Sequence, residues 1–283
     1  MTAIKKLNTS SFRSCFLALT ASALLVSCAK DKEAPETPET PDTAKIVGTN
    51  WVPARAIKIQ DTTYSYQKVV PYKDASGKLI YDKANLETKQ GKGAVYYDEK
   101  FQVVYVVDWP GSQGSATGGA AGFEPFYFNF DRRHNIAPTS ALAGTAPWHI
   151  KFYDIYSAYV VTDGVTGTEG DLGKLRVYRT PFDELDEAVD KTMVRTSVEI
   201  EMEDFSPTDG WGRYRLSDHI LHPYKDRCVV FRLKDGRYVK FQLANLYRSN
   251  PVTVTDKYEF EAPYFNFRYY IQQTPNSRVL KTR

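Results

Sequence analysis

Histidines are the side chains of this sequence best suited to bind a metal ion, and two of the four share one short segment. His219 and His222 lie in the stretch Ser-Asp-His-Ile-Leu-His-Pro of residues 217–223. Neutral imidazole is a common protein ligand for metal ions and for haem iron. In an irregular loop either ring could reach such an iron; the alternative is two loop histidines that are solvated or hydrogen-bonded. His134 and His149 are expected to be surface or strand-edge residues.

No motif in the sequence is typical of catalysis. Gly-x-Ser-x-Gly, His-Glu-x-x-His and Walker sequences are absent. Acidic clusters at residues 183–187 and 199–204 could supply an acid and base pair for a hydrolase, but such clusters are usually solvated faces. Cys228 lies inside a strand pattern, where a cysteine most often serves as a small hydrophobic residue. We therefore expect no enzyme.

The beginning of the chain has the pattern of a bacterial lipoprotein signal peptide. Two lysines and an arginine precede an apolar run at residues 16–26, which is too short to span a bilayer, and residues 25–28 read Leu-Val-Ser-Cys. We predict that residues 1–27 are removed and that Cys28 is lipidated. The alternative is an ordinary secretory signal followed by a chance cysteine.

Residues 28–45 are predicted to be a disordered tether. They are rich in Pro, Glu and Thr and contain no aromatic residue, so they cannot bury enough apolar surface to offset the entropy lost on ordering. Acidic residues soon after Cys28 resemble the export signal of surface-exposed lipoproteins of Bacteroidetes. We therefore expect an outer-membrane lipoprotein that is exposed at the cell surface and touches the membrane through its lipid anchor only.

Charge and cysteine content narrow the function further. The signal segment holds three of the 37 basic residues and none of the 34 acidic ones, so the mature chain would carry equal numbers of both. This balance argues against a nucleic-acid partner.

Of three cysteines, Cys15 would leave with the signal and Cys28 would be lipidated. Cys228 would then have no intrachain disulfide partner, and stability must come from a core.

Strands are the elements expected to position these side chains. Segments rich in β-branched and aromatic residues, several with a period of two, predict strands; they are residues 96–108, 126–130, 151–161, 195–201, 228–233 and 265–272. Turn signals at residues 74–77 and 234–236 predict hairpins, and the best helix candidate, residues 181–190, is short. The sequence therefore predicts an all-β fold with few short helices.

A glycine-rich stretch at residues 111–122 divides the expected domain. It is predicted to be a surface loop rather than a phosphate cradle, because no Lys-Ser/Thr pair and no helix follow it. Before it lies an N-terminal β portion, residues 46–110, of unassigned role. After it lies a β domain of residues 123–283, although one sheet can run through both portions.

The C-terminal portion resembles the HmuY-type haem-binding lipoproteins of Bacteroidetes. The resemblance extends over roughly residues 123–272 and rests on the order and spacing of several blocks. These are residues 126–130, 148–152, 211–214, 224–232, 235–243, Tyr247 and 265–272.

The resemblance implies a fold of two antiparallel sheets of long strands, with haem held between strand pairs by two axial side chains. It also implies a haemophore-like role: the protein would capture haem outside the cell, often from host haemoproteins, and pass it to a TonB-dependent outer-membrane receptor for iron acquisition. Aromatic-rich strands are suited to clamping a planar apolar macrocycle.

The resemblance also implies where the axial ligands lie. The segment expected to carry the first ligand, residues 190–210, has no histidine but contains Met193 and Met202, and methionine serves as a ligand in other members of the family. The second position falls near residues 215–216, a few residues before His219. We predict Met202 and His219 as the axial pair, with His222 and Met193 in reserve. The alternative for each methionine is packing in the core.

A second function stays open on the sequence. The protein could be a non-haem surface lipoprotein that kept the fold without the ligands and binds a glycan or a peptide, or that is an accessory subunit of a receptor. Aromatic side chains such as Trp51 and Trp109 could stack against such a ligand.

Overall fold

The computed structural model of the protein is built almost entirely from strands. It describes residues 51–111, 124–154, 157–163, 174–189, 197–199, 201–202, 210–215 and 217–283. Within these ranges the one helix is α1 (Pro138–Leu142), so the predicted all-β fold is confirmed. None of the helical structure in these ranges is long and apolar enough to cross a membrane. Cys28 and the predicted tether lie outside the described residues.

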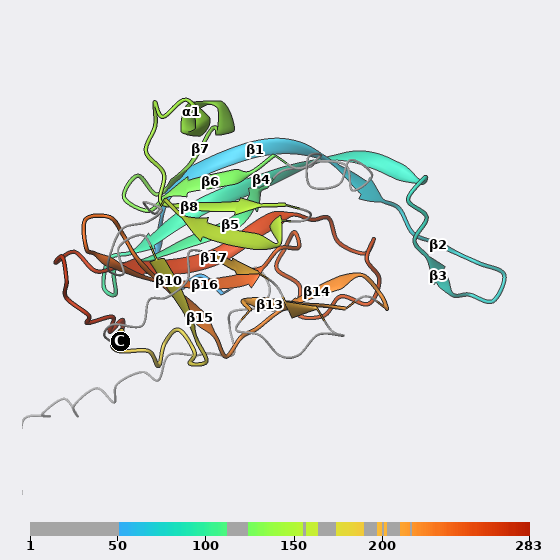
Figure 1. The fold of residues 1–283 in the computed structure, drawn as a ribbon. Coiled ribbons are helices and arrows are strands. Elements are labelled where there is room, and N and C mark those ends of the chain that lie inside the picture. The colour runs from blue at the N-terminus through green and yellow to red at the C-terminus, as the bar shows by residue number, and fades with distance from the viewer. Residues whose placement is uncertain are drawn as a thin grey trace, which may run out of the picture. The chain divides into compact units, whose positions relative to one another are not determined.

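The largest sheet has seven antiparallel strands. In spatial order these are β1 (Ile57–Val69), β4 (Leu86–Asp98), β5 (Val103–Pro110), β17 (Tyr264–Ile271), β16 (Tyr238–Asn245), β15 (Cys228–Arg232) and β10 (Lys174–Tyr178). Because β5 pairs with β17, one sheet joins the portions that precede and follow residues 111–122. Figure 1 shows β1 and β4 as a long paired ribbon that extends toward the small hairpin of β2 (Tyr72–Lys73) and β3 (Leu79–Ile80).

A five-stranded antiparallel sheet packs against one face of the seven-stranded sheet. Its strands, in spatial order, are β11 (Ser197–Glu199), β9 (Tyr159–Thr162), β8 (Ile150–Tyr153), β6 (Phe126–Asn129) and β7 (His134–Ile136). The Phe126 ring stacks on Phe265 with centroids 4.2 Å apart, and Phe128 meets Phe267 edge-on at 5.2 Å. All four rings are buried, and each contributes about 1.5–3 kcal/mol to the free energy of unfolding.

The opposite face of the seven-stranded sheet is also buried, which explains why β16 and β17 have no exposed residue along their length. A second apolar cluster covers it, including Trp51, Phe182 and Leu280. Residues 181–190 were expected to form a helix, but those described, 181–189, form turns and a bridge from Glu187 to Val279 instead. A helix would need the N–H of Ala188 for a bond within the segment, but this N–H donates to a carbonyl of the C-terminal segment instead.

Turn chemistry fixes the hairpins more closely than strand composition does. The predicted turns at residues 74–77 and 234–236 each join two antiparallel strands, as expected. The runs at residues 96–108 and 151–161 were each expected to form one strand, but each contains parts of two strands. In the first run, Gln102 adopts a φ of 54°, in the left-handed region where a strand cannot continue.

Candidate functional site

A three-stranded sheet brings the two leading ligand segments together. It consists of β12 (Glu201–Met202), β13 (Gly212–Arg215) and β14 (Ile220–Pro223), in that order. The backbone of Met202 pairs with Tyr214 in parallel, and Tyr214 pairs with Leu221 in antiparallel register. Met193 lies outside the described residues. The sheet therefore places the strand of Met202 beside the β13–β14 hairpin, which carries His219 in its turn.

His219 occupies a tightly fixed turn. Its φ is 60°, a left-handed conformation that histidine adopts more readily than most side chains, and its N–H donates to the carbonyl of Arg215 at 2.9 Å. An ion pair between Arg215 and Asp218 closes the same turn, and Asp218 also accepts the N–H of Ile220 at 3.0 Å. These contacts hold the imidazole at the exposed end of the hairpin.

One hydrogen bond orients the His219 ring. Its Nδ1 lies 2.8 Å from the Tyr214 hydroxyl, and the two ring centroids are 6.0 Å apart. Because Nδ1 is engaged, Nε2 is the ring nitrogen through which His219 would meet a metal. Tyr214 is half-buried, and its ring packs against the main apolar core. Tyr214 was not predicted as a site residue, and its contact with His219 depends on the left-handed turn at residue 219.

His222 lies on the other side of this sheet. It pairs with Arg213 on β13, and side chains alternate between faces along a strand, so His222 points away from the face that carries Tyr214 and Leu221. His222 is half-buried. The small sheet thus groups His219 with Tyr214 and separates both from His222.

The remaining histidines lie at the five-stranded sheet, His134 on β7 and His149 directly before β8. His149 Nδ1 accepts the N–H of Phe130 at 3.0 Å, while its Nε2 lies 3.8 Å from an Asp131 carboxylate oxygen. Burial lowers the pKa of His149, which keeps the ring neutral and suited to that acceptor role. His134 is exposed on β7, with its ring 5.9 Å from that of Trp109. Neither histidine shares a sheet with His219.

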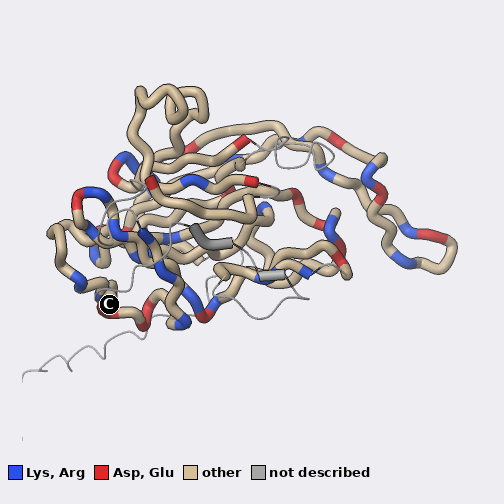
Figure 2. The backbone as a smooth tube through the Cα atoms, in the orientation of Figure 1, with Lys and Arg blue, Asp and Glu red and all other residues tan. Residues whose placement is uncertain are grey.

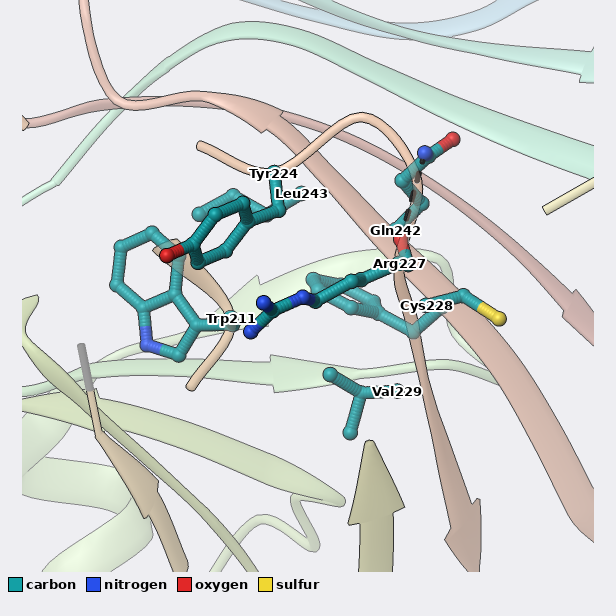
Figure 3. Close-up of a pocket in the computed structure, with 8 residues that line it drawn as sticks. Trp211, Tyr224, Arg227, Cys228, Val229, Gln242 and Leu243 are labelled. Atoms are coloured by element: carbon teal, nitrogen blue, oxygen red, sulfur yellow. Dashed lines mark hydrogen bonds between the residues drawn. The ribbon is translucent and has the colours of Figure 1, made fainter. Parts of the chain in front are cut away.

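A small pocket lies close to the three-stranded sheet (Figure 3). Its lining residues come from β15, β16 and the segments around β13 and β14; they are Trp211, Tyr224, Arg227, Cys228, Val229, Phe241, Gln242 and Leu243. Even with open solvent counted, the empty volume is about 190 Å³, which is smaller than the ~300–1,000 Å³ of sites for drug-sized ligands. This pocket does not hold a porphyrin.

The Arg227 side chain lies between the other residues that line this pocket. Its guanidinium stacks 3.6 Å from the centroid of the Tyr224 ring and donates to the carbonyl of Gly210 at 2.9 Å. The Trp211 indole donates to the carbonyl of Ala158 at 3.0 Å, which joins the start of β13 to the five-stranded sheet. These contacts fasten the small sheet to the rest of the domain.

Two acidic residues of the cluster at 183–187 have structural partners, whereas Glu203 and Asp204 of the second cluster lie outside the described residues. Asp183 pairs with Arg268, and Asp186 pairs with the C-terminal residue Arg283. Across the described ranges, no three His, Cys, Asp or Glu side chains converge to form a metal site. Burial raises the pKa of Cys228 to about 12, so its thiol stays protonated and unreactive at neutral pH.

Comparison with protein-family models and with curated protein sequences finds no match for this chain.

Proposed function

We propose that the protein is a cell-surface lipoprotein that binds haem and passes it to a TonB-dependent outer-membrane receptor. The observation that carries this proposal is the three-stranded sheet, in which the strand of Met202 pairs with the hairpin that holds His219. These two ligand candidates are 17 residues apart in the sequence. The resemblance to HmuY-type proteins implies a first ligand in the segment that contains Met202 and a second near residues 215–216, a few residues before His219.

Haem makes modest demands on a protein site. The porphyrin supplies four ligands to the iron, so the protein adds only one or two axial side chains. His219 is exposed and has Nε2 directed away from its hydrogen bond to Tyr214. The Tyr214 ring packs against the main apolar core, so its hydroxyl orients the imidazole from a fixed position. In this proposal the hairpin supplies one axial ligand.

The haem would lie against the exposed end of the β13–β14 hairpin. The pocket beside Trp211 and Arg227 is too small for the macrocycle. His219, by contrast, is exposed. An open position of this kind suits a protein that hands its ligand on, because release then requires little rearrangement.

The charge distribution fits a carrier at a cell surface. Lysine and arginine alternate with acidic residues along the described chain, and Figure 2 shows both signs spread over it. A mixed surface of this kind provides no extended basic face for nucleic acid. Membrane attachment would come from the lipid on Cys28.

A haemin titration of the full chain tests the proposal. Absorption in the Soret region is followed at equal detergent concentration in every sample, with His219→Gly and Met202→Ala alongside and His134→Gly as the matched control. Glycine is chosen at 219 because it adopts the positive φ without strain.

We expect saturation at one haem per chain and an affinity lowered at least about tenfold by His219→Gly, whether His219 is a ligand or supports one. His134→Gly should bind as the wild type does. A titration without saturation would reject haem binding and favour the non-haem surface lipoprotein that binds a glycan, a peptide or a receptor.

A further inference from the structure

Strand β1 is a long open edge of the seven-stranded sheet. It stands at the end of the strand order and, among the described residues, pairs only with β4. Figure 1 shows it along the upper rim of the sheet. The pairing with β4 keeps one register from residue 60 to residue 69, so every second residue there directs its backbone N–H and carbonyl away from β4. Such an edge is a template for a further strand.

Aromatic packing holds this edge in place. The ring centroid of Tyr264 lies 5.1 Å from that of Tyr64 and 6.2 Å from that of Tyr66, and the Arg248 guanidinium lies 4.3 Å from the Tyr66 centroid. The Tyr64 ring also lies across Gly91 of β4, where a Cβ atom would come within 2.3 Å of it. Strand β1 is therefore ordered before a partner arrives, which reduces the entropy lost on pairing.

The centre of β1 lacks the devices that usually protect an edge strand. These devices are charged side chains, prolines and bulges. Residues 62–67 read Thr-Thr-Tyr-Ser-Tyr-Gln, with no charge, proline or glycine, and the irregularity of β1 lies before them, between residues 58 and 60. Thr63, Ser65 and Gln67 are exposed on the face that points away from the tyrosine packing. An uncharged segment of this composition favours strand pairing.

A second copy of the chain fits this edge because β1 is complementary to itself. A two-fold symmetric antiparallel pair is centred on one residue, so exposed residues meet exposed residues across it. When the pair is centred on Tyr64, Asp61 faces Gln67 and Lys68 faces Gln60. Each charged side chain of residues 60–69 then meets a neutral amide. A centre one residue later would set the aspartate against an apolar valine.

We propose that β1 pairs antiparallel with β1 of a second copy, centred on Tyr64, and joins the two seven-stranded sheets into one. Residues 60–68 of both copies would form about eight to ten backbone hydrogen bonds, a number within the range of specific protein interfaces. On the exposed face, Thr63 of one copy lies opposite Ser65 of the other. This interface is independent of the candidate haem site on β13 and β14.

Sedimentation equilibrium of the full chain tests this pairing, in a detergent matched in density to the buffer and at physiological salt. Thr63→Glu/Ser65→Glu sets like charges opposite each other in the dimer, whereas Thr63→Glu/Ser65→Lys sets opposite charges there. The control, Thr88→Glu/Gln90→Glu, places two carboxylates on the same face of β4, one strand further from the edge. Thermal unfolding of each variant checks the fold.

We expect the wild type to form a dimer. Its dissociation constant should rise at least about tenfold in Thr63→Glu/Ser65→Glu, because the new carboxylates repel each other across the interface. Thr63→Glu/Ser65→Lys should dimerise at least as tightly as the wild type, since its new charges attract. The control on β4 should match the wild type.

A wild-type chain that stays monomeric up to about 100 μM, far above the dissociation constants of specific complexes, would overturn the proposal. A dimer that Thr63→Glu/Ser65→Glu leaves unchanged would also overturn it, because such a dimer forms through another surface. Equal weakening by the two double variants of β1 would reject the register centred on Tyr64.

Discussion

Two tyrosine hydroxyls are shielded from solvent, and they differ in whether a hydrogen-bond partner is present. Tyr269 is fully buried, and its hydroxyl donates to the carbonyl of Phe130 at 2.7 Å, which ties β17 to the five-stranded sheet. The Tyr64 hydroxyl is shielded from solvent and has no hydrogen-bond partner among the residues that the structure describes. Burial of an unpaired hydroxyl is unfavourable, whereas loss of a buried pair leaves a carbonyl unsatisfied.

We therefore predict that Tyr269→Phe lowers the free energy of unfolding by about 1–3 kcal/mol, while Tyr64→Phe leaves it unchanged or raises it. Urea unfolding of the two variants measures both effects, and each serves as the control for the other. Equal destabilisation by both substitutions would show that the Tyr64 hydroxyl has a partner.

Lys240 is a fully buried cation, and it should make stability depend on pH. Its ammonium group donates to the carbonyl of Leu185 at 3.0 Å and to Thr282 Oγ1 at 2.9 Å. Burial lowers its pKa from 10.5 to about 8. Between these two values the unfolded chain binds more protons than the native one, so this group makes stability rise with pH across that window.

The test compares the wild type with Lys240→Met from pH 7 to pH 9. Over this range the free energy of unfolding of the wild type should rise relative to the variant by about 1 kcal/mol, the part of the linkage that falls below pH 9. Taking the difference cancels groups common to both chains. Curves that stay parallel would mean that Lys240 titrates as a solvated lysine.

At the residue scale the sequence indicated one half of the candidate site. His219 was predicted from its residue type and its position in the segment 217–223. Tyr214 lies in one of the blocks that carry the family resemblance but had no predicted role, because its contact with His219 depends on a left-handed turn that the spacing does not dictate. Histidine is one of few side chains that tolerate this conformation, and only the folded hairpin shows that it does so here.

At the scale of elements, the segment around residues 181–189 depends on one buried ion pair. Arg268 on β17 donates to both oxygens of Asp183 at 3.1 and 2.7 Å and to Gln242 at 3.0 Å. Both charged side chains are almost fully buried. Removing the carboxylate would leave the guanidinium buried without its counter-charge.

Asp183→Ala is expected to lower the free energy of unfolding by about 3–5 kcal/mol. Glu187→Ala is the matched control in the same segment: its exposed carboxylate pairs with Arg278 at the surface, and its loss should cost about 0–1 kcal/mol. Denaturant unfolding of both variants gives the comparison. A cost for Asp183→Ala no greater than for Glu187→Ala would contradict the role assigned to the buried pair.

The elements that could be predicted from the sequence are those whose conformation depends on neighbouring residues. The turns at 74–77 and 234–236 contain Asp and Gly at the positions such turns require, and both hairpins form. The expected helix at 181–190 has suitable composition, but the C-terminal segment pairs with the carbonyl of Asp186 and the N–H of Ala188. Such partners lie about ninety residues away in the sequence, so a local pattern does not reveal them.

At the scale of the whole molecule, long-range strand pairing creates the scaffold on which the candidate site stands. The pairing of β5 with β17 joins residues more than 150 positions apart. The all-β class follows from composition and periodicity, but the order of strands within a sheet does not. β13 and β14 belong to a separate three-stranded sheet, which the hydrogen bonds of Trp211 and Arg227 fasten to the rest of the domain.

The central claim is that haem binds at the β13–β14 hairpin, and hydrogen–deuterium exchange of the full chain with and without haemin tests it most directly. Amides of bound regions exchange more slowly because local opening becomes rarer. We predict slower exchange in peptides that cover residues 210–224 when one equivalent of haemin is present, with β2 and β3 unchanged. Unchanged exchange at 210–224, or slower exchange only elsewhere, would contradict the claim.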